Sequence, residues 1–265
     1  MKTILHVLLL VTALECFAFD ELLFKPLEAN PIEARIGMLY QPNVDKLRMD
    51  IGNAFDLSEL INNNNLKLRT GGDFMTFTRL RSVGKLKFPV ETTDYYFGIN
   101  ISSLINLNNK KIYTRMRIAH ISSHLIDGYT NNWEFIKTPF VYSREFIDLV
   151  IAAYLREDFR VYLGTNVVFS TIPKDFSPIE GQIGFDSQRY LNKLFDLEFG
   201  YDFRLRNLNN TYYGQNSFQA GLKLKTYENI GLFFGYYFYS GLSIHGLFYD
   251  EIDSYHGLGF QIKYK

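Results

Sequence analysis

Apolar and polar residues alternate with a period of two along most of this chain. The clearest case is LFDLEFGYDFRLR at 194–206, in which aromatic and aliphatic side chains fall on one face and Asp196, Glu198, Asp202, Arg204 and Arg206 on the other. A period of two sustained over such a length predicts a β-strand. The same alternation recurs from residue 46 to the last residues of the chain.

The alternating rows and the breakers between them predict about twelve strands. They fall at 35–40, 46–58, 66–81, 88–105, 110–127, 143–156, 158–171, 179–187, 194–206, 212–226, 229–244 and 254–265. Many are close to the ~9 to 11 residues that cross a bilayer at a tilt, whereas strands of soluble sandwiches usually have ~5 or 6. We therefore expect an all-β fold, a single antiparallel transmembrane β-barrel over 35–265, with a secreted sandwich as the alternative.

The turn signals predict two kinds of connection. Tight turns are expected at 62–65, 106–109, 156–159 and 226–229, and longer loops at 128–142, 172–178, 207–211 and 245–253. In bacterial barrels short turns are periplasmic and long loops extracellular, so both termini are expected on the periplasmic side. The TGGD run at 70–73 interrupts the alternation and predicts a β-bulge.

The first eighteen residues have the features of a secretory signal. Lys2 is followed by an apolar run from Ile4 to Leu14, which is too short for a permanent transmembrane helix, and we expect cleavage after Ala18. Residues 19–34 contain Pro26 and Pro31 and are expected to form an irregular N-terminal lead-in. These features predict export and insertion into an outer membrane.

The amino-acid composition disfavours some classes of function. The 28 acidic and 28 basic residues cancel, so nothing in the charge balance favours a nucleic-acid partner. The single cysteine, Cys16, lies in the predicted signal, so we expect no disulfide. The polar faces carry both signs of charge, which predicts a salt-bridged, largely filled lumen with at most a narrow path for small solutes. The residues assigned to it include Arg48, Asp50, Arg115, Arg117, Asp196, Glu198 and Arg204.

The sequence HISSHL at 120–125 contains the candidate functional residues. Arg115 and Arg117 occupy odd positions of the predicted strand and apolar residues the even ones, so His120, Ser122 and His124 are expected to face lipid at the extracellular end. Polar side chains on that face require partners, because an unsatisfied buried polar group costs ~1 to 3 kcal/mol.

Three interpretations of these residues remain open. A serine hydroxyl activated by His120 or His124, with Glu145 of the next strand orienting the imidazole, would form an acyl hydrolase acting on lipid esters. The favoured interpretation is instead a polar rim at the membrane interface of a structural, interaction or narrow transport barrel, with the acyl hydrolase as the alternative. His245 and His256 are also expected to be interface histidines. A metal site is disfavoured, because residues i and i+4 of a strand lie ~13 Å apart; no cofactor or metal is therefore expected.

Two resemblances to known families extend these expectations. The His-x-Ser pair with a carboxylate on the following strand resembles outer-membrane phospholipase A and the lipid A deacylases, whose pair lies on the outside of a barrel. More widely, five segments resemble the outer-membrane barrel family labelled domain of unknown function 1207: HISSHLIDGY at 120–129, YSREFIDLVIAAYLREDFRVYLG at 142–164, FDLEFGYDF at 195–203, FFGYYFYSGLS at 233–243 and HGLGFQIKY at 256–264. This chain reads HLIDGY where the family more often has HLGDEY. The resemblance implies an outer-membrane barrel and no particular activity.

Overall fold

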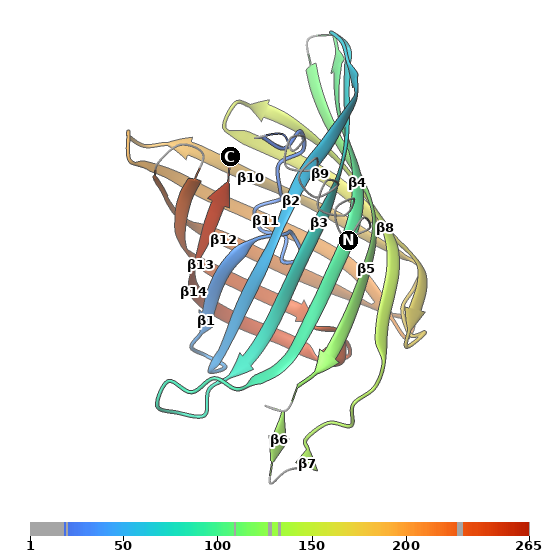
Figure 1. Ribbon diagram of the computed structural model, residues 1–265, viewed down its shortest axis with the longest axis vertical. Coiled ribbons are helices and arrows are strands. Elements are labelled where there is room, and N and C mark those ends of the chain that lie inside the picture. Colours follow the sequence, from blue (N-terminus) through green and yellow to red (C-terminus); the bar gives the residue numbers. More distant parts are fainter. Residues whose placement is uncertain are drawn as a thin grey trace, which may run out of the picture.

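The chain forms one closed antiparallel β-barrel (Figure 1). The computed structural model describes residues 19, 21–108, 110–126, 129–131, 134–226 and 230–264, so the predicted signal segment lies outside the described residues. Twelve strands form the barrel wall in the order β1-β14-β13-β12-β11-β10-β9-β8-β5-β4-β3-β2. The strands are β1 (Ile36–Gln41), β2 (Lys46–Asn62), β3 (Leu66–Arg81), β4 (Val90–Leu107), β5 (Lys110–Leu125), β8 (Tyr142–Arg156), β9 (Phe159–Ile172), β10 (Ile179–Tyr190), β11 (Phe195–Leu208), β12 (Thr211–Lys225), β13 (Ile230–Leu242) and β14 (Ile252–Tyr264).

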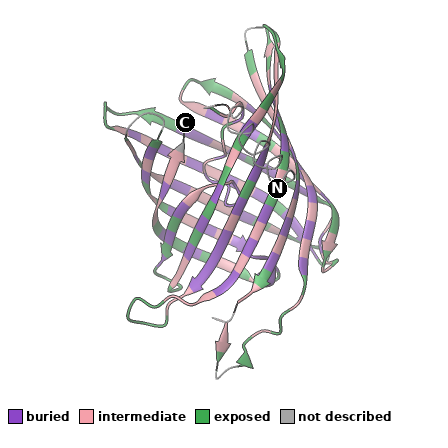
Figure 2. Ribbon diagram, in the orientation of Figure 1, coloured by how far each residue is buried: buried purple, intermediate pink, exposed green. Residues whose placement is uncertain are grey.

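The alternation in the sequence becomes an inside and an outside of the barrel. Along β11 the polar residues Asp196, Glu198, Asp202 and Arg204 are buried, while the intervening apolar residues are more exposed. Figure 2 shows this alternation of buried and exposed residues on most strands. Because the buried face is the charged one and the exposed face is apolar, the wall has the polarity of a transmembrane barrel. The predicted fold class is confirmed, and the secreted sandwich is wrong because the sheet closes on itself.

Two local predictions need correction. No long loop occupies 207–211, because β11 and β12 pair up to Leu208↔Thr211 and are joined by Asn209 and Asn210. Both asparagines have positive φ (50° and 63°), as a two-residue hairpin turn requires. The irregularity expected at 70–73 lies on the partner strand, where the register shifts between Asp56 and Ile61. Gly71 is needed there because a Cβ would lie 1.9 Å from the carbonyl oxygen of Phe55.

The two ends of the barrel differ. One end, the short-turn end, carries the tight connections 63–65, 108–109, 157–158, 191–194 and 226–229 together with the end of β14. The other, the long-loop end, carries 82–89, 126–141, 173–178 and 243–251, and the hairpin of β6 (Thr130–Asn131) and β7 (Glu134–Phe135) extends from it (Figure 1). Strands β2 to β5 are the longest, and their hairpins project beyond β14 at the short-turn end (Figure 1).

The N-terminal lead-in folds back inside the barrel. Residues 21–35 have no regular secondary structure, as expected, but Phe24, Leu27, Ala29 and Ile32 are buried within the lumen. Lumen side chains bind its backbone: Arg160 donates to the carbonyl oxygens of Lys25 and Pro26, at 2.8 and 2.7 Å. Arg48 donates to the carbonyl oxygen of Pro31 at 2.6 Å. This segment is therefore a plug held by the charged lumen, which the sequence did not predict.

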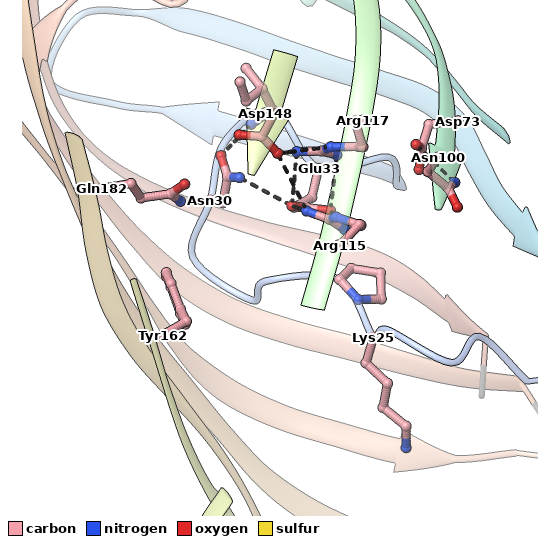
Figure 3. A network of polar contacts seen from close by, with 12 residues as sticks. Lys25, Asn30, Glu33, Asp73, Asn100, Arg115, Arg117, Asp148, Tyr162 and Gln182 are labelled. Atoms are coloured by element: carbon pink, nitrogen blue, oxygen red, sulfur yellow. Dashed lines mark hydrogen bonds and ion pairs between the residues drawn. The ribbon is translucent and has the colours of Figure 1, made fainter. Parts of the chain in front are cut away.

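An ion-pair network anchors the plug in the middle of the lumen (Figure 3). Glu33 of the plug accepts two hydrogen bonds from Arg115, at 2.5 and 3.0 Å, and lies 3.4 Å from Arg117. Arg117 is fully buried and also binds Asp148 of β8 at 2.8 Å. The seven charges assigned to the lumen are all buried, as predicted. Among them, Arg48 binds Asp50 at 2.8 Å and Arg204 lies 3.4 Å from Asp202.

The connection 243–251 closes the lumen at the long-loop end. It includes the short 3-10 helix η1 (Gly246–Phe248), whose residues are buried. His245 is buried against Asp94 of β4, with Nδ1 and Oδ2 2.7 Å apart, so the interpretation of His245 as an interface histidine is wrong. Phe248 is also fully buried, and the Arg79 guanidinium lies 3.7 Å from the centre of its ring. Among the described residues, no helix has the length and apolar character needed to cross a membrane.

Removing the anchor of the plug should destabilise the barrel. Glu33→Ala leaves Asp148 as the one carboxylate within 4.0 Å of Arg115 and Arg117 among the described residues. Breaking a buried ion pair in this way costs about 3 to 5 kcal/mol. We expect a lower midpoint temperature for loss of the compact, fast-migrating form on cold SDS gels. Glu134→Gln, in the exposed β6–β7 hairpin, is the control and should not change the midpoint. Equal midpoints for both variants would contradict the anchoring role.

The plug and the closed long-loop end also predict a lumen without a wide pore. In planar lipid bilayers the intact protein should show no large, steady conductance, because the plug and η1 obstruct the path at different depths. Frequent stable openings of porin size would contradict a filled interior.

Candidate functional site

The candidate site lies across the boundary between β5 and β8. The connection 126–141 returns the chain beside β5, so the strands pair in antiparallel fashion with His120 opposite Glu145 and Ser122 opposite Ser143. Both pairs lie near the ends of their strands that face the long-loop end. The register therefore brings the two segments together at one height.

The candidate side chains point out of the barrel. Ala119, Ile121 and Ser123 are buried, while His120 and Ser122 between them are partly exposed and His124 is exposed. The side chains of His120 and Glu145 are 42% and 28% exposed. In a transmembrane barrel this outer surface faces lipid, so the direction predicted for these residues agrees with the structure.

Glu145 holds the imidazole of His120. Nδ1 of His120 lies 2.9 Å from Oε1 of Glu145, within hydrogen-bond distance. Ser143 donates its hydroxyl to the same carboxylate oxygen at 2.6 Å, and Ser170 of β9 faces Glu145 in the register. Glu145 is thus fixed from both sides and can orient the ring.

Ser122 and His124, the other two polar residues discussed above, are not part of the His120–Glu145 contact. No hydrogen bond joins Ser122 to His120 or His124 in the described part of the chain. His124 instead packs edge-on against Tyr95 of β4, with ring centres 5.6 Å apart. The structure therefore brings His120 and Glu145 together, places Ser122 two residues along the same face, and leaves His124 apart from the pair.

The contact with Glu145 determines which ring nitrogen of His120 can act as a base. When Nδ1 carries the proton that it donates to Glu145, Nε2 is the unprotonated nitrogen and can accept a proton from a hydroxyl. Across the described ranges, no three side chains of His, Cys, Asp or Glu are grouped to hold a metal ion. The arrangement is that of an oriented base with a serine nearby.

Sequence reasoning missed the serines around Glu145 and a second histidine–carboxylate pair. Ser143 was within the run YSRE, and its spacing of two residues from Glu145 on a strand would have placed both on one face. His245 and Asp94 are 151 residues apart, and no local pattern links them. That pair lies inside the lumen, where Asp94 also accepts the backbone N–H of Gly246 at 2.8 Å, so it holds the 243–251 connection in place.

The closed antiparallel wall, its apolar exterior and its charged interior define the class of outer-membrane β-barrels. Within this class, the chain belongs to the family described as protein of unknown function (DUF1207), whose model matches residues 85–264. The resemblance noted in the sequence is thereby confirmed. No curated protein sequence matches the chain.

Solved structures with a similar fold include two outer-membrane phospholipases. The Salmonella typhi enzyme, solved as a dimer with bound calcium, has a TM-score of 0.57 and 15% identity, covering 91% of this chain and 94% of that one. Outer membrane phospholipase A of Escherichia coli has a TM-score of 0.56 and 15% identity, covering 89% of this chain and 94% of that one. At this identity the likeness concerns the fold.

The outward direction of Ser122 can be tested by labelling. With Cys16 replaced by Ser, Ser122→Cys should react with a nitroxide reagent and give a spin label that collides readily with oxygen dissolved in the bilayer. Ser123→Cys is the matched control, because Ser123 is 3% exposed and faces the lumen. Ser123→Cys should label poorly. If a label at residue 123 collided with oxygen more readily than a label at residue 122, the register would be contradicted.

Proposed function

We propose that this protein is an exported outer-membrane barrel that hydrolyses acyl esters of membrane lipids on its lipid-facing surface. The observation that carries the proposal is the His120–Glu145 contact of 2.9 Å across β5 and β8, on the outer face and beside Ser122. A histidine–carboxylate pair on the outside of a barrel wall needs a reason, because desolvated polar groups are costly where lipid surrounds them.

The three residues have distinct roles in this proposal. Glu145 holds the Nδ1–H tautomer of His120, and Nε2 takes the proton from the Ser122 hydroxyl as its oxygen attacks the ester carbonyl. The bond to the alcohol breaks, and the alcohol leaves with the proton from His120. Water then attacks the acyl-serine with His120 again acting as base, which releases the carboxylic acid and restores Ser122.

The position of the site favours a lipid as substrate. His120 lies on the outward face of β5, so the outer surface near the long-loop end is where a substrate can meet it. That end is extracellular in barrels of this class, and the esters at that height are those of phospholipids or lipid A. The fold likeness to two outer-membrane phospholipases supports the same assignment.

Catalysis requires Ser122 and His120 to come within hydrogen-bond distance when substrate binds. Catalytic hydrogen bonds are often long in the absence of substrate and shorten in the complex. Glu145 already contacts both His120 and Ser143, so its role in these steps is to orient the imidazole.

A second candidate function is a structural or interaction barrel without catalytic activity. The observation that favours it is the plug, which buried ion pairs and hydrogen bonds connect to the wall of the barrel. His120, Ser122 and Glu145 would then be a hydrogen-bonded polar rim at the membrane interface. The two candidates differ in whether acyl esters are cleaved.

A measurement of acyl-ester release distinguishes the acyl hydrolase from the non-catalytic barrel. Detergent-solubilised protein should release fatty acid from a phospholipid or from lipid A, measured with and without calcium. Ser122→Ala and His120→Ala should lower the rate by at least ~10³-fold, because nucleophile and base act as a unit. Glu145→Gln should lower it less, since it removes only the orienting carboxylate and leaves the nucleophile and the base in place.

The matched control is Ser254→Ala. Ser254 is another exposed serine at the long-loop end, two residues from His256, whose ring binds the Tyr236 hydroxyl and not a carboxylate. Its removal should leave the rate unchanged. Folded protein with no ester release from any of these lipids, or release that persists in Ser122→Ala, would remove the hydrolase proposal and leave the non-catalytic barrel.

A further inference from the structure

A large cavity opens inside the barrel at the short-turn end, away from the candidate hydrolase site. Its volume is about 540 Å³. One wall is the plug segment 21–25, and the others are side chains at the ends of β3, β4, β5, β8 and β9. In barrels of this class the short-turn end faces the periplasm, so we call this cavity the periplasmic vestibule.

The vestibule is rich in positive charge. Five cationic side chains line it, against two carboxylates, Glu21 and Glu157. The cationic ones are Lys25, Lys67, Arg69, Lys111 and Arg160. Since the whole chain has a net charge of zero, this excess of cations is a local feature of one cavity.

Three of these cations have no ion-pair partner among the described residues; two of them, Lys25 and Lys111, are exposed, and Lys67 is partly buried. Arg69 binds Glu59 at 3.0 Å and Arg160 binds Asp186 at 2.6 Å. No ion pair or hydrogen bond joins the side-chain ammonium groups of Lys25, Lys67 or Lys111 to any residue within the described ranges. Figure 3 shows the Lys25 side chain pointing away from the Glu33 network. Unneutralised ammonium groups around one cavity attract anions.

The vestibule is closed on its inner side. Phe24 and Leu27 of the plug pack with Val150, Ala152 and Tyr162 of the wall, and Tyr113 packs against this cluster. Tyr113 and Tyr154 line the cavity with ring centres 5.5 Å apart. A ligand entering from the short-turn end would thus meet this cluster as a floor.

We propose that the periplasmic vestibule binds a phosphate-bearing anion through Lys25, Lys67 and Lys111. Lysine ammonium groups bind phosphate as point charges and adapt on flexible stems to its tetrahedral oxygens. The tyrosine rings provide apolar surface and hydroxyls for the organic part of the ligand. The phosphate can belong to a free solute or to the headgroup of an anionic phospholipid of the periplasmic leaflet, and both present the same group to the lysines.

The test is titration calorimetry on the purified full-length barrel in a neutral detergent. Three probes are used in parallel: pyrophosphate for the free solute, dihexanoyl phosphatidylglycerol for the anionic headgroup, and dihexanoyl phosphatidylcholine as its zwitterionic counterpart. We expect pyrophosphate or the phosphatidylglycerol to bind, more weakly as salt is raised. In the triple variant Lys25→Gln, Lys67→Gln, Lys111→Gln, the affinity should fall at least tenfold.

A matched variant controls for the loss of three charges. Lys85→Gln, Lys87→Gln, Lys174→Gln removes three exposed lysines from connections at the long-loop end and should bind as the unmodified protein does. Heat-modifiable migration on gels verifies that both triple variants are folded. Binding of pyrophosphate identifies a free solute, and binding of phosphatidylglycerol alone identifies a headgroup. Absence of binding by both anions, equal affinity in the two triple variants, or equal binding of the phosphatidylcholine would overturn the proposal. The lipid hydrolysis assay is independent of these outcomes.

Discussion

Charge burial in the lumen is the constraint on which the rest of this structure depends. A barrel in a membrane turns its apolar residues outward, so the charged faces of most strands are buried in the interior. A charged group removed from water is stable only when it is paired and hydrogen-bonded. Arg115 and Arg117 meet this requirement through Asp148 of the wall and Glu33 of the plug. The plug therefore supplies a carboxylate that the buried arginines of the wall need as a partner.

The occupied interior also determines which parts of the protein a substrate or ligand can reach. With the middle of the lumen occupied, two regions remain accessible: the outer surface and the ends. On the outer surface the β5–β8 register brings His120 to Glu145. At the short-turn end, three lysines without an ion-pair partner in the described part of the chain line a cavity. These regions lie at opposite ends of the strands, so one barrel separates a lipid-facing arrangement near the long loops from an anion-attracting one on the other side.

Much of this fold was predictable because each wall residue has only two environments. Period-two alternation thus located the strands, the lumen charges and the outward direction of His120, Ser122 and Glu145. The Asn209–Asn210 hairpin was misjudged because asparagine adopts the left-handed conformation and lets pairing continue through what looked like a loop. The positions of the plug and of His245 depend on contacts between residues distant in sequence. Likewise, the 126–141 connection is long enough to allow several registers, so the pairing of His120 with Glu145 required the structure.

The short span between the plug and the first strand links two steps of assembly. Glu33 lies only three residues before Ile36, where β1 begins, and β1 is the strand that joins β14 to β2 and completes the cylinder. When β1 takes this place in the wall, the chain geometry holds Glu33 within a few residues' reach of Arg115 and Arg117. Closure of the sheet and neutralisation of its interior are thus coupled by the covalent chain. Without β1 the sheet would be open along a seam, and without the attached Glu33 the buried Arg115 and Arg117 would lose a carboxylate partner.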